Sequence, residues 1–152
     1  MSGIAVLGRE TRVVVRATAD NPAVDIDAPA RVVSMILESD ADHVVERDLP
    51  YGAAVEGVST AALREAGRRA VAPSDREHVT PFITRRHTEF RTLSPSAPIA
   101  IRRPDLRFSV DLSVELEYMR RVFTEAGDGS HPIPLVALVR AADRLASKAE
   151  VA

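Results

Sequence analysis

Cysteine is absent from the sequence, which excludes disulfide bonds, catalytic thiolates and cysteine-ligated zinc. No apolar run approaches the roughly 20 residues that a transmembrane helix needs, and the N-terminal segment is too weakly charged for a secretory signal. A net charge of −2 over 152 residues gives no general argument for binding to nucleic acid or membranes. From these absences we expect a cytoplasmic protein without nucleic-acid or membrane partners.

Lysine is nearly absent as well, because Lys148 is the only lysine among 20 basic residues. A GC-rich genome explains such a bias, but the bias also has a chemical consequence. A phosphate or carboxylate site in the body of the chain must use the forked guanidinium of arginine instead of a lysine ammonium. The residues that are present, 45% of them hydrophobic, suit one globular domain over residues 1–152.

Segments rich in β-formers alternate with amphipathic segments, which predicts an α/β fold with a mixed, mostly parallel sheet. We expect strands within residues 11–18, 42–46, 51–59 and 106–110. We expect helices that start near Asp27 and that cover residues 60–71, 73–86, 114–126 and 134–148. Ser59 is the expected cap of the second helix. The valines at 13–15 predict a first strand that is buried on both faces, as in a parallel sheet.

Two aspartates, Asp20 and Asp111, follow the first and the last predicted strand. Ligands of open α/β sheets bind at the carboxyl ends of the strands. Two carboxylates that converge there can hold Mg²⁺ against substrate phosphates. The alternative is that each aspartate caps a turn or a helix, where this residue type is favoured. The sequence spacing leaves both interpretations open.

Residues 75–83 form an unusually polar helix start that contains Arg76, Glu77 and His78. Glu77 and His78 are candidates for acid–base chemistry, because the unperturbed pKa of histidine lies near about 6.5. The alternative is a solvated first turn in which the helix dipole favours Glu77. The basic run at 85–87 either binds an anion or forms a solvated helix end.

Four segments carry a resemblance to a known family. They are residues 18–22, 52–56, 75–83 and 107–117, which read TADNP, GAAVE, DREHVTPFI and RFSVDLSVELE. In this order they resemble the sugar cytidylyltransferases of the spore coat polysaccharide type, which are relatives of CMP-KDO and CMP-acylneuraminate synthetases. The resemblance covers about residues 10–126, and a C-terminal helix in residues 127–152 lies outside it.

The resemblance implies a three-layer α/β/α fold of the nucleotide-diphosphosugar transferase type. It also implies Mg²⁺-dependent transfer of CMP from CTP to an acidic or modified sugar of a surface polysaccharide or glycan, with release of pyrophosphate. In that reaction Asp20 and Asp111 would bind the metal. Leu112 and Val114 depart from the family motif around Asp111, but the aspartate itself and the helix start are kept.

The resemblance further implies where the sugar binds. Glu56 matches an acidic position near the sugar pocket, and Gly52 is expected in a turn beside it. The segment that contains Arg76, Glu77 and His78 is expected to border the pocket. There, Glu77 and His78 would be the catalytic acid–base groups. Arg76 or Arg16 would bind a carboxylate or a phosphate through charge-assisted hydrogen bonds.

The family begins with a strand and a loop rich in glycine, arginine and lysine that grips CTP, and residues 1–9 do not resemble that loop. We therefore expect a chain that is truncated at its N-terminus relative to the family and incomplete as a transferase. One alternative is a subunit completed by a partner chain or by a homodimer that covers the exposed sheet edge. Another is a non-catalytic sugar-binding or assembly subunit.

Overall fold

A computed structural model describes residues 11–77, 80–127 and 132–150, and it shows a mixed α/β protein. The chain divides into two compact units. The first, called the sheet unit, comprises residues 1–16, 29–45 and 56–95, and the second, called the α5–α6 unit, comprises residues 17–28, 46–55 and 96–152. The predicted fold class is confirmed. Within the described residues, no helix is both long and apolar enough to cross a bilayer.

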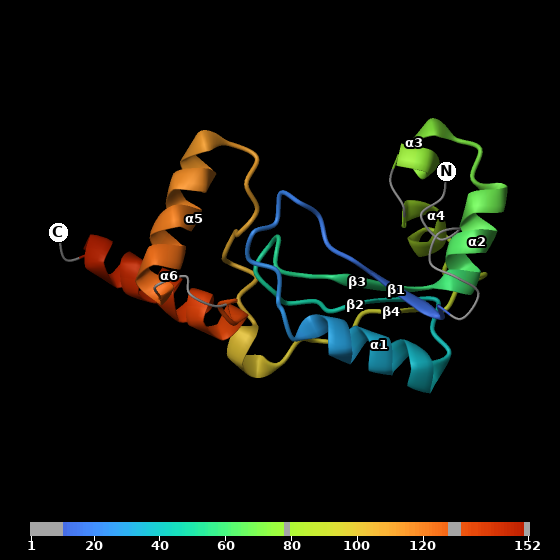
Figure 1. The fold of residues 1–152 in the computed structure, drawn as a ribbon, viewed down its shortest axis with the longest axis horizontal. Helices are drawn as coiled ribbons and strands as arrows, with labels where there is room; N and C mark the ends of the chain where they lie inside the picture. Colours follow the sequence, from blue (N-terminus) through green and yellow to red (C-terminus); the bar gives the residue numbers. More distant parts are fainter. Residues whose placement is uncertain (1–10, 78–79, 128–131, 151–152) are drawn as a thin grey trace. The chain divides into compact units, whose positions relative to one another are not determined.

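The sheet unit contains four strands in the order β1-β3-β2-β4 (Figure 1). Their bounds are β1 Val13–Arg16, β2 His43–Val45, β3 Glu56–Ser59 and β4 Thr92–Leu93. β3 pairs antiparallel with both β1 and β2, and β2 pairs parallel with β4. Two of the three pairings are therefore antiparallel, so the expectation of a mostly parallel sheet was wrong in this respect.

The expectation that β1 is buried on both faces was also wrong, because all four of its residues are only partly buried. β1 is an outer strand of the described sheet and pairs with β3 alone. A run of valines fits a pleated, half-buried surface as well as a fully buried one. The composition of the strand therefore could not distinguish an edge strand from a central one.

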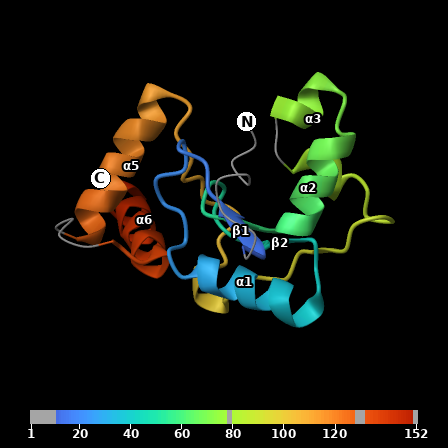
Figure 2. The same cartoon turned by 45° about the vertical axis from the view of Figure 1, so that its right-hand side comes forward.

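Helices cover both faces of the sheet, and β3 shows how (Figures 1 and 2). Successive residues of a strand point to opposite faces. Gly57 faces α1 (Ala28–Ser39), since a Cβ atom built on it would lie 2.9 Å from Cδ1 of Ile36. Val58 points the other way, into an apolar cluster with α2 (Thr60–Arg69) and α4 (Pro81–Thr84). The sheet unit therefore has the three layers that the resemblance implied.

The start of α2 follows the prediction. The Ser59 hydroxyl accepts a hydrogen bond from the backbone N–H of Ala62 at 3.1 Å, which confirms Ser59 as the N-cap. The predicted helix over residues 73–86 is wrong, because the structure has α3 (Pro73–Glu77) and, as a separate helix, α4. Pro81 occupies the first turn of α4. Proline is tolerated at that position but interrupts a helix when it falls inside one.

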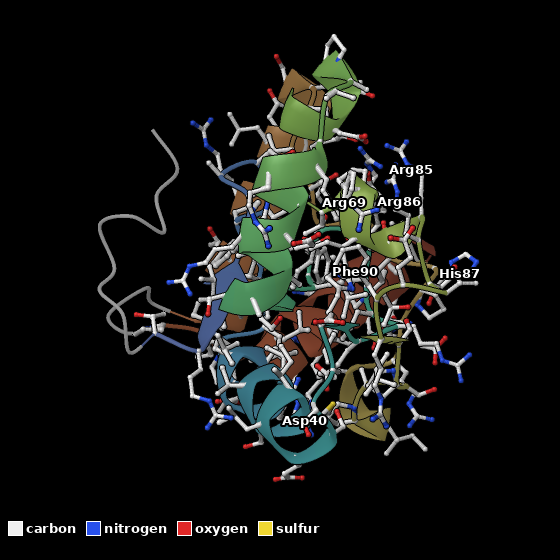
Figure 3. All side chains as sticks on the ribbon, turned by 90° about the vertical axis from the view of Figure 1, so that its right-hand side faces the viewer. Asp40, Arg69, Arg85, Arg86, His87 and Phe90 are labelled. Atoms are coloured by element: carbon white, nitrogen blue, oxygen red, sulfur yellow. The ribbon has the colours of Figure 1, made fainter. Side chains whose placement is uncertain are left out.

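The basic run at 85–87 holds α4 in place (Figure 3). The guanidinium of Arg86 lies 3.7 Å from the ring centroid of Phe82 and donates to the Phe82 carbonyl at 2.9 Å. Arg85 forms an ion pair with Asp75 of α3. Arg69 of α2 lies on the same side of this unit and donates to Glu89 at 2.6 Å. Because these guanidiniums contact groups of the protein itself, the arrangement supports the interpretation of a helix end over that of an anion site.

The α5–α6 unit is built on two long helices, α5 (Ser113–Ala126) and α6 (Leu135–Glu150), which pack side by side (Figure 2). A short 3₁₀ helix, η2 (Ile99–Ile101), packs against α6. The apolar faces that the periodicity predicted form one core. Its largest fully buried side chains are Phe108, Met119, Val122, Leu135 and Leu138.

One expectation for this unit was wrong. The strand expected at 106–110 is reduced to an isolated parallel bridge between Tyr51 and Arg107. In addition, Val114 and Leu116 in the first turn of α5 are 68% and 40% exposed. The helix does not bury its first turn, although the periodicity of its apolar residues extends into that turn.

Candidate functional site

The predicted site residues fall into both units. Arg16 and Glu56 belong to the sheet unit. Asp20, Gly52 and Asp111 belong to the α5–α6 unit. Arg76 and Glu77 lie in α3, where the structure describes the backbone but not their side chains, and His78 lies outside the described residues. The predicted residues therefore give two candidate centres, one in each unit.

In the sheet unit, strand pairing brings Arg16 and Glu56 together. They are directly opposite each other in the antiparallel pairing of β1 with β3. Nη1 of Arg16 donates to Oε2 of Glu56 at 3.3 Å, and the hydroxyl of Thr80 donates to Oε1 of Glu56 at 3.3 Å. The Glu56 side chain is 25% exposed. The cluster therefore offers a ligand both a carboxylate acceptor and guanidinium donors.

A third strand adds His43, which the sequence analysis did not select. Its Nε2 atom lies 4.0 Å from Oε1 of Glu56, and its side chain is only 3% exposed. This Nε2 atom is buried and has no hydrogen-bond partner among the described residues. Burial lowers the pKa of His43, and the negative charge of Glu56 partly opposes that shift. His43 is thus a neutral imidazole beneath a carboxylate.

His43 was missed because its sequence neighbours give no signal for it. His43 and Glu56 are 13 positions apart and meet only through the register of two strands. A usable signal is the occurrence of one titratable residue in each of two neighbouring predicted strands. That signal becomes specific only when the pairing is known, because a shift of one residue moves a side chain to the other face.

In the α5–α6 unit, the backbone brings Asp20 next to the segment that contains Asp111. The N–H of Val110 donates to the carbonyl oxygen of Asp20 at 2.8 Å. The Asp111 side chain is exposed and forms an ion pair with Arg107. Glu115 accepts from the N–H of Asp111 at 2.7 Å and from Nε of Arg107 at 2.6 Å. These hydrogen bonds lower the pKa of Glu115 and fix the start of α5 beside Asp111.

Gly52 occupies the tightest position of this centre. Its φ of 89° is in the left-handed region, in a turn where the N–H of Ala53 donates to the Pro50 carbonyl at 3.0 Å. A Cβ atom on Gly52 would lie 2.7 Å from the backbone nitrogen of Ser109. The expected turn at Gly52 is confirmed. The hydroxyl of Ser109 is buried there without a hydrogen-bond partner among the described residues.

The residues of this centre fit Mg²⁺ by donor type. Within the described ranges, no group of three or more histidine, aspartate or glutamate side chains could hold a metal ion by itself. Mg²⁺ does not require such a cage, because one or two carboxylates together with water and substrate phosphates suffice. Asp20 and Asp111 supply two carboxylates within one unit, and their backbones are joined through Val110.

A hollow of about 280 Å³ lies in the sheet unit at the opposite end of β3 from Glu56. Its lining includes Arg12, Asp42 and Ser59. The Asp42 carboxylate is engaged by the Ser59 hydroxyl at 3.2 Å and by the backbone N–H of Arg91 at 3.0 Å. None of the residues predicted for the site is among those described as lining it, so we place no chemistry there.

Comparison with known proteins gives three findings. The sequence pattern of a family described as cytidylyltransferase matches residues 4–136. The chain is 30% identical over 99 residues to an uncharacterized protein of Methanocaldococcus jannaschii, and 26% identical over 117 residues to the spore coat polysaccharide biosynthesis protein SpsF of Bacillus subtilis. Its fold is similar to a cytidylyltransferase structure from Leptospira borgpetersenii, with a TM-score of 0.82 at 17% identity.

The matches cover unequal shares of the proteins compared. They include 65% and 76% of this chain, but only 41% of the Methanocaldococcus protein and 49% of SpsF. The structural match includes 95% of this chain and 61% of the Leptospira protein. The chain therefore spans less than half the length of the two curated relatives.

Proposed function

Because the chain belongs to the cytidylyltransferase family, we propose that it takes part in transferring CMP from CTP to a sugar used in a surface polysaccharide or glycan. The relationship to SpsF supports the polysaccharide part of this proposal. The acceptor we propose is an acidic or modified sugar, as for the CMP-KDO and CMP-acylneuraminate synthetases. The observation that carries the proposal is the hydrogen bond between Val110 and Asp20, which joins the two segments that bear the proposed metal ligands.

In the proposed site, Asp20 and Asp111 hold Mg²⁺. When bound, this ion would neutralise negative charge that develops on the phosphate oxygens of CTP. Arg107 now forms an ion pair with Asp111 and a hydrogen bond with Glu115. If Asp111 bound a metal and gave up its ion pair with Arg107, the guanidinium could therefore keep its hydrogen bond with the Glu115 carboxylate.

For the sheet unit by itself, we propose a role in binding the sugar. The Glu56 carboxylate accepts from sugar hydroxyl groups, and Arg16 uses its remaining N–H donors for a carboxylate or phosphate. Arg76 is proposed for the same anion-binding role. Glu77 and His78 are proposed as acid–base groups, since an unshifted histidine pKa near about 6.5 suits proton transfer close to neutral pH.

Calorimetry with CTP tests the proposal, in the presence and absence of Mg²⁺. We expect Mg²⁺-dependent binding that is lost in Asp20→Ala and in Asp111→Ala. Glu117→Ala removes an exposed carboxylate from the same helix start and should bind like the wild type, which makes it the matched control. Unchanged binding in both aspartate variants would remove the metal assignment.

The same measurement separates the competing function. A chain that binds an acid sugar but shows no CTP binding at millimolar nucleotide would be a sugar-binding or assembly subunit that needs a partner. The apparent mass of the protein alone and with nucleotide then shows whether a homodimer forms. Transfer of CMP to an acid sugar by this chain alone would instead contradict the expectation that it is incomplete as a transferase.

A further inference from the structure

His43 and Glu56 are diagonal neighbours on the face of the sheet that α2 and α4 cover. His43 lies opposite Val58 in the pairing of β2 with β3, and Glu56 lies two residues before Val58 on the same face. Diagonal neighbours of an antiparallel pair are within reach of each other when their side chains are long. The 4.0 Å separation between Nε2 of His43 and Oε1 of Glu56 is the result.

The imidazole has a polar atom that its surroundings do not satisfy. Nε2 of His43 is buried without a hydrogen-bond partner among the described residues, and the only carboxylate recorded near it is Glu56. Unpaired buried polar atoms are unfavourable, and each one needs a structural or functional reason. The separation from Glu56 exceeds an ordinary hydrogen bond by about 1 Å, which a small rotation of the carboxylate closes.

The bonds of Glu56 show where a ligand can attach. A carboxylate offers about four acceptor positions on its two oxygens. Arg16 donates to Oε2 and Thr80 donates to Oε1. A bond from His43 would take the second position on Oε1. Among the described residues, the position left over is on Oε2, beside the guanidinium of Arg16, whose side chain is 33% exposed.

We propose that His43 is a positioning residue for the acceptor sugar. It is a neutral imidazole protonated at Nε2, which donates to Oε1 of Glu56 and so orients Oε2 toward a hydroxyl group of the ligand. The identification of the ligand as a sugar rests on the proposed function, whereas the contact between the two side chains does not. The burial that lowers the pKa of His43 keeps the imidazole in the neutral form that this role requires.

Long-range ¹H–¹⁵N NMR of the full chain tests the contact without any ligand, because it distinguishes the two neutral tautomers of histidine. The His43 signals are assigned by their disappearance in His43→Gln. We expect the tautomer protonated at Nε2. We also expect the ¹³C shift of the Glu56 carboxyl group to change in His43→Leu and to be kept in His43→Gln, whose amide nitrogen replaces Nε2. A His43 protonated at Nδ1 would overturn the proposal, because its Nε2 could not donate to a carboxylate.

Binding of N-acetylneuraminic acid, in the presence of CTP and Mg²⁺, tests the role in positioning. We expect the affinity to fall about tenfold in His43→Leu, as for the loss of one charge-assisted hydrogen bond, and to be largely restored in His43→Gln. His87→Gln, at an exposed histidine of the same unit, should bind like the wild type. Equal affinities of the wild type and folded His43→Leu would refute the role. If the wild type binds no acid sugar, the proposed acceptor class fails and with it the role in positioning the sugar, whereas the tautomer still shows whether His43 donates to Glu56.

Discussion

In the sheet unit, polar side chains are placed by strand register, whereas in the α5–α6 unit they are placed by loops. Arg16, Glu56 and His43 come from three strands whose pairing puts them on one face. Asp20, Gly52 and Asp111 come from irregular segments that are tied by a few backbone hydrogen bonds, including an isolated bridge, and by one close approach of a glycine. The first arrangement depends on a repeated ladder, and the second depends on a few contacts that each matter individually.

This difference predicts different tolerance to mutation. In the ladder, several hydrogen bonds hold the backbone, and flexible side chains next to a crowded substitution can move aside. In the loops, a substitution meets backbone atoms, which cannot move aside without breaking the contacts that hold the loop. Both tyrosines, Tyr51 and Tyr118, belong to the α5–α6 unit, and the sequence has no tryptophan. Tyrosine fluorescence therefore reports unfolding of that unit, while circular dichroism reports helices of both units.

The largest expected effect is that of Gly52→Ala. It places a side chain at a φ of 89° and 2.7 Å from the backbone nitrogen of Ser109, where no flexible side chain can move aside. We expect the free energy of unfolding to fall by about 3 kcal/mol, from strain and overpacking together. Urea unfolding followed by tyrosine fluorescence measures it.

Gly67→Ala is the control for this change, and because Gly67 lies in the sheet unit, its unfolding in urea is followed by circular dichroism. Gly67 lies inside α2, and a Cβ atom on it meets nothing within 4 Å. Because glycine is a poor helix former, we expect this variant to be more stable by up to about 1 kcal/mol. If Gly52→Ala were as stable as Gly67→Ala, the loop would not depend on the close approach.

Gly57→Ala tests the same kind of change in the sheet unit. The new Cβ would lie 2.9 Å from Cδ1 of Ile36, which is the end of a flexible side chain. We expect a smaller loss than at Gly52, about 1–2 kcal/mol, because α1 can adjust its side chains. Circular dichroism during urea unfolding measures it. A loss larger than that of Gly52→Ala would contradict the proposed difference between the units.

Ser59→Ala removes the cap of α2. The hydroxyl accepts from the N–H of Ala62 and donates to Asp42, so its loss should cost about 1 kcal/mol. Ser113→Ala, at the exposed first position of α5, should change stability by less than about 0.5 kcal/mol. If the free energy of unfolding fell no more in Ser59→Ala than in Ser113→Ala, the Ser59 hydroxyl would not stabilise the sheet unit as a helix cap.

The smallest expected effect is a dependence of stability on pH that comes from His43. Its pKa in the folded protein is lowered, so the unfolded chain binds the proton more strongly. Stability should therefore be complete above the unfolded pKa of about 6.5 and should decrease as the pH falls below it. His43→Gln should lose this component. Glu56→Gln should lower the His43 pKa further, as NMR titration can show, since the negative charge that opposes the shift is removed.

The helices were predictable because their apolar periodicity is long, and α2, α5 and α6 lie close to where the pattern placed them. The Ser59 cap was predictable from local chemistry alone. The break before α4 was not predicted, although Pro81 inside the expected helix is a signal for it, because the polar run around Asp75 also fits the start of one longer helix. The strand expected at 106–110 did not form, because an alternating pattern shows only that a segment can pair and not that a neighbouring strand is available.

The candidate site was predictable only in part. Residue type and family resemblance selected Glu56 and Arg16, and the structure shows that they pair. His43 depended on register, which no local pattern contains. The metal-binding role of Asp20 and Asp111 and the acid–base role of His78 remain predictions, and the calorimetry proposed above tests the first of them.

Three successive residues of β3 lie in three different surroundings. Glu56 accepts a hydrogen bond from Arg16, Gly57 lies against α1, and Val58 packs in the apolar core against α2. The cap of α2 follows at once at Ser59. In the evolution of this chain, substitutions around β3 can be accommodated, but adding or deleting one residue would exchange the two faces of the strand. Alignment gaps among homologous sequences should therefore fall outside residues 56–59, even where few identities are shared.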